Sequence, residues 1–189
     1  GKVTIIEDVE RIAVDLREIW KLGLDPIESM MDLLEENGIK VWSIDQDLDH
    51  FDAAIMWIND ESPVFVCKEG VPGDRQRYNL AHELGHLILN PGEDIDEEKA
   101  AHRFAGAFLV PRSKVYEELG KNRNNISYQE LFLLKHKYGL SMQAWIYRAK
   151  DLGVISQSKY KKMFIDLSKK GWREIEPGDP VESEKPGRM

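Results

Sequence analysis

The sequence predicts an α+β fold in which helices surround a small antiparallel sheet, and three observations lead to this prediction. Apolar residues recur at helical spacing on both sides of the middle of the chain. Three short runs rich in β-branched and aromatic residues lie between these regions, at 39–44, 53–58 and 63–68. The 189 residues are 42% hydrophobic and 32% charged, which is typical of a soluble globular domain with a real core.

Two helices are expected before the strands, over residues 4–23 and 24–38. The second has the clearer boundaries. Asp25 is suited to be its N-cap, Pro26 to occupy its first turn and Gly38 to end it. The strands therefore begin directly after a well-defined helix end.

The next segments lead through the strands into a helical region. A turn at 59–62 joins the second and third strands, and a loop at 68–76 follows them. The helix after this loop is expected to stop at Pro91. Another helix lies within 94–111, because acidic residues suit its beginning and a proline ends it.

The C-terminal third predicts further helices and a polar end. Residues 112–120 form a short helix, and three more are expected within 127–172. We therefore divide the chain into a core at 1–126, a helical, basic C-terminal module at 127–172 packed on that core, and a tail at 173–189. The prolines and charges of the tail predict that it is mobile.

The net charge of −8 is unevenly distributed. The segment from Lys135 to Arg173 contains ten basic and two acidic residues, a net charge of +8, whereas residues 1–134 have a net charge of −13. Such asymmetry suits a nucleic-acid or acidic-partner surface, and helix faces that balance an acidic body explain it equally well. The sequence has no membrane-length apolar run and no signal pattern, so we expect a cytoplasmic protein. The single cysteine, Cys67, falls in a predicted strand, and we expect a structural role for it.

Residues 78–90, YNLAHELGHLILN, place His82, Glu83 and His86 on one helix. The two imidazoles lie about 40° apart around the helix and about 6 Å apart along it, so they converge on one point. Histidines at this spacing can bind one zinc ion, while Glu83 projects to the side, where it can act on water without being a ligand. Gly85 beside them leaves room for a closely approaching backbone or ligand.

An ordinary amphipathic core helix is the alternative interpretation of this segment. The apolar residues of the helix do share one face, but that face is opposite the histidines. They are Leu80, Leu84, Leu87 and Ile88. One side of the helix is therefore available for packing and the other for chemistry.

A hydrolytic zinc site needs a third protein ligand and one open position. In the next helix Glu98 and His102 share a face with small alanines, which would let the two helices approach closely. Glu97 points about 100° away from that face. Geometry alone leaves Glu98 and His102 as competitors, with Glu97 as a further option.

The segments 74–90 and 98–111 together resemble the ImmA/IrrE family of zinc-dependent HExxH metallopeptidases. In that family a helix with the HELGH type of motif precedes a helix of pattern E-x-x-A-N-x-F-A…L-x-P. A looser similarity extends over most of residues 15–175. The resemblance implies a zincin-like helical peptidase domain.

Carried over residue by residue, the resemblance implies one zinc ion per chain, bound by His82, His86 and Glu98 in a gluzincin-like manner. Glu83 is then the catalytic base. One position departs from the family pattern, because His102 stands where the family usually has asparagine. His102 could then bind the metal, hydrogen-bond to a ligand or contact the substrate.

The mechanism implied by these roles is hydrolysis of a peptide bond. Zinc lowers the pKa of its bound water toward about 7, Glu83 takes the proton, and the hydroxide attacks the polarised carbonyl. A further donor for the oxyanion is expected. Tyr78 and His102 are candidates by proximity in sequence, and a structural role is the favoured alternative for each.

The resemblance also implies a partner, because members of the family are associated with cleaving helix-turn-helix repressors of the XRE type, in mobile-element immunity and in stress response. Related chains carry their own N-terminal helix-turn-helix domain. Since the chain begins at Gly1 without methionine, both an excised portion of a longer regulator and a tag remnant are compatible with it.

Two other functions remain as alternatives: a DNA-associated transcription regulator and a toxin-antitoxin component, with zinc in a regulatory or structural role. Residues 130–153 read as helix, glycine turn and helix, which invites a DNA-binding interpretation. These helices also carry many apolar residues, which favours packing on the core. The residues concerned are Phe132, Leu133, Leu134, Trp145 and Ile146.

Overall fold

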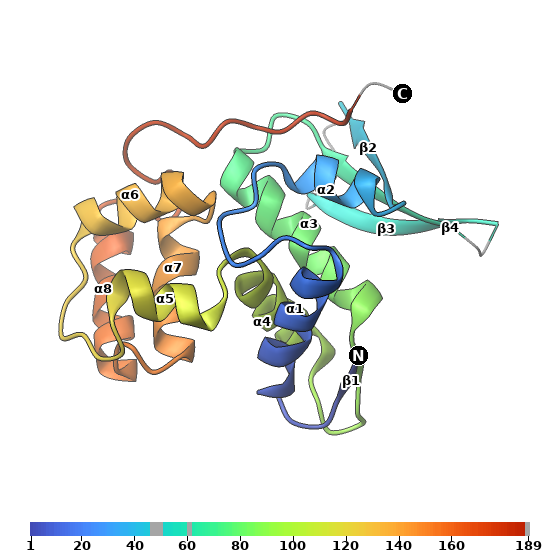
Figure 1. Ribbon diagram of the computed structural model, residues 1–189. Helices are drawn as coiled ribbons and strands as arrows, with labels where there is room; N and C mark the ends of the chain where they lie inside the picture. Colours follow the sequence, from blue (N-terminus) through green and yellow to red (C-terminus); the bar gives the residue numbers. More distant parts are fainter. Residues whose placement is uncertain (46–50, 60–61, 188–189) are drawn as a thin grey trace.

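The computed structural model describes residues 1–45, 51–59 and 62–187, which form eight helices and two small sheets (Figure 1). This architecture confirms the predicted α+β class. In chain order the elements are β1 (Lys2–Val3), α1 (Asp8–Ile19), α2 (Met30–Glu36), β2 (Lys40–Ile44), β3 (Ala53–Ile58), β4 (Ser62–Lys68), α3 (Gly73–Ile88), β5 (Asn90–Pro91), α4 (Glu97–Leu109), α5 (Arg112–Leu119), α6 (Tyr128–Tyr138), α7 (Met142–Asp151) and α8 (Gln157–Lys169).

The three predicted strands form one sheet in the order β2-β4-β3. β3 runs antiparallel to β4, with Ile55 opposite Phe65, but β2 runs parallel to β4, with Val41 opposite Phe65. The prediction of an antiparallel sheet was therefore wrong for this pair. Side-chain alternation is the same in both kinds of pairing, so it carries no information on strand direction. The centre of the predicted 59–62 turn, residues 60–61, lies outside the described residues.

The beginning of α2 differs from the prediction. Ser29 is the N-cap, and its side chain accepts a hydrogen bond from the amide of Asp32 at 3.1 Å. Asp25 is not the cap, because the helix begins only at Met30; the carbonyl oxygen of Asp25 instead accepts a hydrogen bond from the buried guanidinium of Arg17. The end was predicted correctly: Gly38 follows the helix with a φ of 81°.

The core confirms the two-sided interpretation of α3. Leu80 and Leu84 are fully buried, while Leu87 and Ile88 pack at the edge of the core. Cys67 is buried and free, as expected for a structural residue in a strand. None of the helices in the described part of the chain has the length and apolarity that a membrane crossing needs.

Helices α5 to α8 lie together beside α1 and α4 (Figure 1). The apolar residues that argued against a free DNA-binding pair are largely buried, since Leu134, Trp145 and Ile146 are at most 5% exposed. Leu133 is the exception, at 63%. Helices α6 and α7 therefore use most of their apolar surface for packing.

Part of the basic charge in this region is neutralised within the chain. Arg148 of α7 is buried and forms an ion pair with Glu10 of α1. Among the described residues Lys135 also pairs with Glu176 and Asp74, and Lys137 pairs with Glu118. The positive charge of residues 135–173 that is available to a partner is therefore smaller than the net +8 counted from the sequence.

Residues 173–187, which we call the C-terminal strap, run as an extended segment from the end of α8 toward β2 (Figure 1). Glu176 accepts hydrogen bonds at 3.0 Å from the amides of Met142 and Gln143, at the beginning of α7. Lys135 also donates to it at 2.9 Å. The described part of the tail, which was predicted to be mobile, thus has defined hydrogen-bond partners. The division of the chain into core, C-terminal module and tail at residues 126 and 172 stays a prediction.

The strap has a second anchor at Glu184. Its carboxylate accepts hydrogen bonds from the amides of Met30 and Met31, at 3.0 and 2.8 Å, and so caps the beginning of α2. It also accepts one from Arg77 of α3 at 2.5 Å. A single carboxylate therefore joins the strap, α2 and α3.

Candidate metal centre

The site lies between α3 and α4, which approach each other closely at Gly85. A Cβ atom at this position would lie 3.1 Å from the Cα atom and 3.3 Å from the carbonyl oxygen of Ala101. Gly85 therefore admits a neighbouring backbone, one of the two possibilities that the sequence suggested. This contact places the first turn of α4 over the histidines of α3.

This contact predicts an unusual result for Gly85→Ala. Alanine normally stabilises a helix by about 1 kcal/mol relative to glycine. Here its methyl group would press on Ala101, and overpacking costs about 1–3 kcal/mol. We expect a free energy of unfolding that is unchanged or lower by up to about 2 kcal/mol, measured by urea denaturation. A variant more stable than the parent would contradict the close contact.

Three predicted ligands meet at this point. The Nε2 atoms of His82 and His86 lie 3.2 Å apart. The carboxylate of Glu98 on α4 reaches both, with one oxygen 3.3 Å from His82 Nε2 and the other 3.1 Å from His86 Nε2. The structure therefore brings together all three residues that the sequence proposed as metal ligands.

The spacing of these donors fits zinc. Ligand atoms bound about 2.0–2.1 Å from a tetrahedral zinc ion lie about 3.3 Å from each other. The distances among the donors of His82, His86 and Glu98 are 3.1–3.3 Å. The side chain of Glu98 is 67% exposed, which leaves that side of the group open for a fourth ligand.

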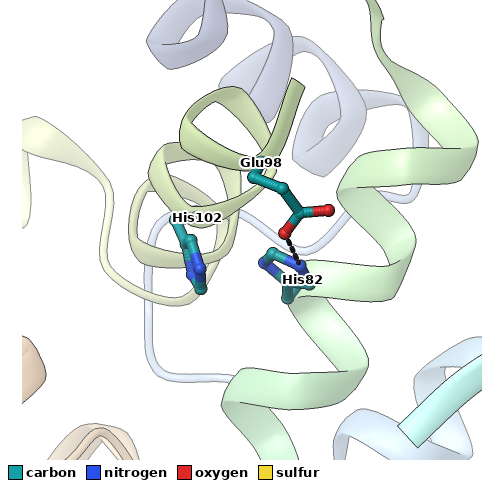
Figure 2. Close-up of side chains that lie close together, drawn as sticks. All are labelled: His82, Glu98 and His102. Carbon is teal, nitrogen blue, oxygen red and sulfur yellow. Dashed lines mark ion pairs between the residues drawn. The ribbon is translucent and has the colours of Figure 1, made fainter. Parts of the chain in front are cut away.

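His102 lies on the other side of His82. Figure 2 shows Glu98 and His102 reaching from α4 toward His82 on α3. The ring centroids of His82 and His102 are 4.2 Å apart. Ligand atoms of His82, Glu98 and His102 all lie within 4.8 Å of one another, so this group too is a candidate metal site. His82 and Glu98 belong to both groups, whereas His86 and His102 distinguish them.

The remaining imidazole nitrogens have different surroundings. His86 Nδ1 lies 3.2 Å from a carboxylate oxygen of Glu97, an arrangement that orients metal-bound histidines in many sites. His82 Nδ1 is buried without a hydrogen-bond partner among the described residues. Glu97, a further ligand option by sequence, is therefore placed to orient His86.

Burial favours the neutral form of His82 and of His102. Burial, together with the charges of His102 and His86, lowers the pKa of His82 to about 4. Burial also lowers the pKa of His102. Because a metal binds the neutral imidazole, both rings are ready to bind at neutral pH.

Glu83 interacts electrostatically with two residues of the metal group, His86 and Glu98. Burial raises the pKa of its carboxyl group, while His86 and a hydrogen bond from the backbone of Ile55 in β3 oppose this shift. A raised pKa makes the carboxylate a better proton acceptor. The edge strand β3 thus contributes to the site through its backbone, which no side-chain motif in the sequence could indicate.

Tyr78 lies one helical turn before His82 and contacts His102. Its hydroxyl is 3.2 Å from His102 Nδ1 and donates to the carbonyl oxygen of His102 at 3.3 Å. Burial raises the pKa of Tyr78 well above its usual value, so the phenol keeps its proton. The structure therefore brings the two candidate oxyanion donors together beside His82.

Comparisons with known proteins agree with this arrangement. The family model described as the IrrE N-terminal-like domain, a peptidase family, matches residues 34–150. The match covers more than half of the chain and includes α3 and α4. A search of curated proteins found no match.

Among solved structures, the fold is similar to that of a Mycobacterium tuberculosis transcriptional regulator, with a TM-score of 0.55 and 15% sequence identity. The similarity covers 76% of this chain and 46% of the regulator. The chain thus spans about half the length of that protein, and the likeness concerns the fold alone.

Proposed function

The chain belongs to the ImmA/IrrE family of metallopeptidases, and on this premise we propose that it is a zinc-dependent endopeptidase that cleaves a helix-turn-helix repressor. The observation that carries the proposal is the triangle of donor atoms of His82, His86 and Glu98, 3.1–3.3 Å apart on two tightly packed helices. Glu83 beside this triangle supplies the base that peptide hydrolysis needs.

Each residue then has a defined role. His82, His86 and Glu98 hold the metal, and Glu97 orients His86 through Nδ1. When bound, zinc supplies a Lewis acid that polarises a peptide carbonyl and acidifies water. Glu83 accepts a proton from the attacking water and returns it to the leaving amine.

The choice of substrate rests on the family. Its members are associated with removing repressors of the XRE type, and the proposed outcome is derepression of mobile-element or stress-response genes. Incubation of the zinc-loaded chain with purified XRE-type repressors, followed by intact-mass spectrometry, tests this. We expect one or a few discrete cleavages. A zinc-free protein after purification in zinc-replete medium would refute the enzyme hypothesis.

The third ligand can be identified by zinc affinity. Loss of a hydrogen-bond partner of a ligand already costs about 10- to 100-fold in metal affinity, so we expect Glu98→Ala to cost more than about 100-fold. His102→Asn, which introduces the family's usual residue, should retain zinc within about threefold, because few ligand contacts change. Competition with a chromophoric chelator measures both values. The reverse order of affinities would make His102 the third ligand.

A further inference from the structure

A cavity of about 520 Å³ lies beside the metal centre. Its walls come from the N-terminal half of α3, from the α6–α7 region and from residues 173–180 of the C-terminal strap. Lining residues include Asp74, Tyr78, Lys135, Gln143, Ile175 and Glu176. Its volume lies within the range of about 300–1,000 Å³ that is usual for ligand pockets.

The buried charges at this cavity are unbalanced. Lys135 Nζ lies 3.5 Å from Asp74 Oδ2 and 2.9 Å from Glu176 Oε2, and all three side chains are at most 7% exposed. Two carboxylates thus share one ammonium group. Asp74 lies in the first turn of α3, where the helix dipole favours a charged carboxylate.

Asp74 also has an unused acceptor. Its Oδ1 atom is buried and has no hydrogen-bond partner among the described residues. A buried carboxylate oxygen without a donor costs free energy, about 1–3 kcal/mol or more for a charged group. The nearby Arg75 does not supply this donor, because its guanidinium pairs with Asp52 at 2.9 Å. Arg173 lies over the ring of Phe164.

The cavity and the metal centre are connected by a row of side chains on α3 that turns by about 40° around the helix at each step. Asp74, Tyr78, His82 and His86 follow one another at intervals of four residues, and Tyr78 both lines the cavity and contacts His102. Eight helical residues span about 12 Å, and an extended peptide covers this distance in three or four residues. A peptide bond held at the metal could therefore present a nearby side chain to the cavity.

We propose that this cavity is a substrate subsite for an arginine or lysine side chain, whose cationic group hydrogen-bonds to the carboxylate of Asp74. In the free chain Oδ1 has almost no exposed surface, so the proposal includes a small rotation of the Asp74 side chain that turns this oxygen toward the cavity. The inference rests on the proposed peptidase function and adds a preference for a basic residue within about four positions of the cleaved bond. Charge-assisted hydrogen bonds to a buried carboxylate are the strong ones, so a cation is favoured over a neutral donor.

The first test measures binding to the full chain without any cleavage. Nα-acetyl-arginine amide is titrated while amide NMR shifts are recorded, and Nα-acetyl-glutamine amide is the neutral comparison. We expect shifts at Gln143, Ala144 and Ile175, with at least tenfold weaker binding of the glutamine compound. Equal binding of the two compounds, or shifts confined to other surfaces, would overturn the proposal.

Matched variants identify the residue responsible. Asp74→Asn keeps the shape of the side chain and should weaken binding of the arginine compound at least tenfold. Ala144→Leu fills the cavity from another wall and should do the same without a change in charge. Arg11→Gln, which removes a cation from the exposed surface of α1 and not from the cavity lining, should bind like the parent. Thermal melting establishes that each variant is folded, and undiminished binding by both cavity variants would exclude this site.

The second test relates the cavity to cleavage. A mixed peptide library is digested by the zinc-loaded parent and by Asp74→Asn, and cleavage sites are read by mass spectrometry. We expect the parent to select arginine or lysine at one nearby position and Asp74→Asn to lose that selection. Cleavage by the parent without a basic preference overturns the subsite. If the arginine compound binds but the parent cleaves nothing, the cation site stands and the proposed peptidase function fails.

Discussion

Glu83→Gln should abolish most repressor cleavage while leaving zinc binding intact. Glutamine preserves the shape of the side chain but cannot accept the proton of the attacking water. General base catalysis typically contributes about 10²–10⁴-fold, so we expect the cleavage rate to fall by this factor. Single-turnover cleavage measured by intact-mass spectrometry gives the rate, and elemental analysis gives the zinc content.

The control for this variant is Glu117→Gln on α5, which removes a carboxylate that is 64% exposed and remote from the site. It should cleave at the rate of the parent. A Glu83→Gln protein that binds zinc and cleaves normally would exclude Glu83 as the base. A variant that loses zinc as well would instead assign Glu83 a role in holding the metal.

Arg148→Met should strongly destabilise the protein. Arg148 Nη2 lies 2.7 Å from Glu10 Oε2, and the guanidinium also donates to the carbonyl oxygen of Val110. Both charged side chains are less than 10% exposed. In the variant the buried carboxylate of Glu10 keeps only Arg103, whose Nε lies 3.2 Å from Oε1. Loss of one partner of a buried pair typically costs about 3–5 kcal/mol, and because Arg103 remains we expect a loss of about 3 kcal/mol in the free energy of unfolding, measured by urea denaturation.

A surface pair on α1 provides the control. Arg11 and Asp15 lie 3.1 Å apart with more than half of each side chain exposed, so Arg11→Met should cost less than about 1 kcal/mol. Similar losses in the two variants would contradict the importance of burial.

The loss caused by Arg148→Met should depend on pH. Burial raises the pKa of Glu10, but the hydrogen bond and charge of Arg148, together with the charges of Arg103 and Arg112, outweigh it and lower the pKa below the ordinary 4.5. The stability from this pair is therefore fully present above pH 4.5 and is lost as the pH falls through the lowered pKa. The difference in the free energy of unfolding between the parent and Arg148→Met should therefore become smaller as the pH falls below 4.5. A constant difference would assign the loss to packing alone.

The sequence predicted correctly those features of the fold that depend on neighbouring residues in the chain. The apolar stripe of α3, its end before Pro91 and the glycine after α2 all depend on residues within one or two turns. The beginning of α2 could not be predicted in this way. Ser29 rather than Asp25 caps α2, and the amides of Met30 and Met31 also bond to Glu184, a contact that exists only in the folded chain.

The candidate site shows the same division. His82 and His86 converge because of their spacing on one helix, and the family resemblance pointed to Glu98. The contacts of Glu97 with His86 and of Ile55 with Glu83 depend on how the helices and β3 pack, so the sequence had no signal for these roles. The charge imbalance around Asp74 likewise appears only when α3, α6 and the strap are assembled.

The C-terminal strap also constrains when the protein can finish folding. The amide of Met31 finds its partner in Glu184, 153 residues later in the chain. Ribosomes add about 5–20 residues per second, so roughly 8–30 s separate the synthesis of these two groups. During this interval the beginning of α2 and the side chain of Arg77 lack their carboxylate. In a nascent chain these groups would therefore lack their hydrogen-bond acceptor until the strap has been synthesised. Hydrogen exchange of the Met31 amide in arrested nascent chains would show this, because the amide becomes protected only when Glu184 is present.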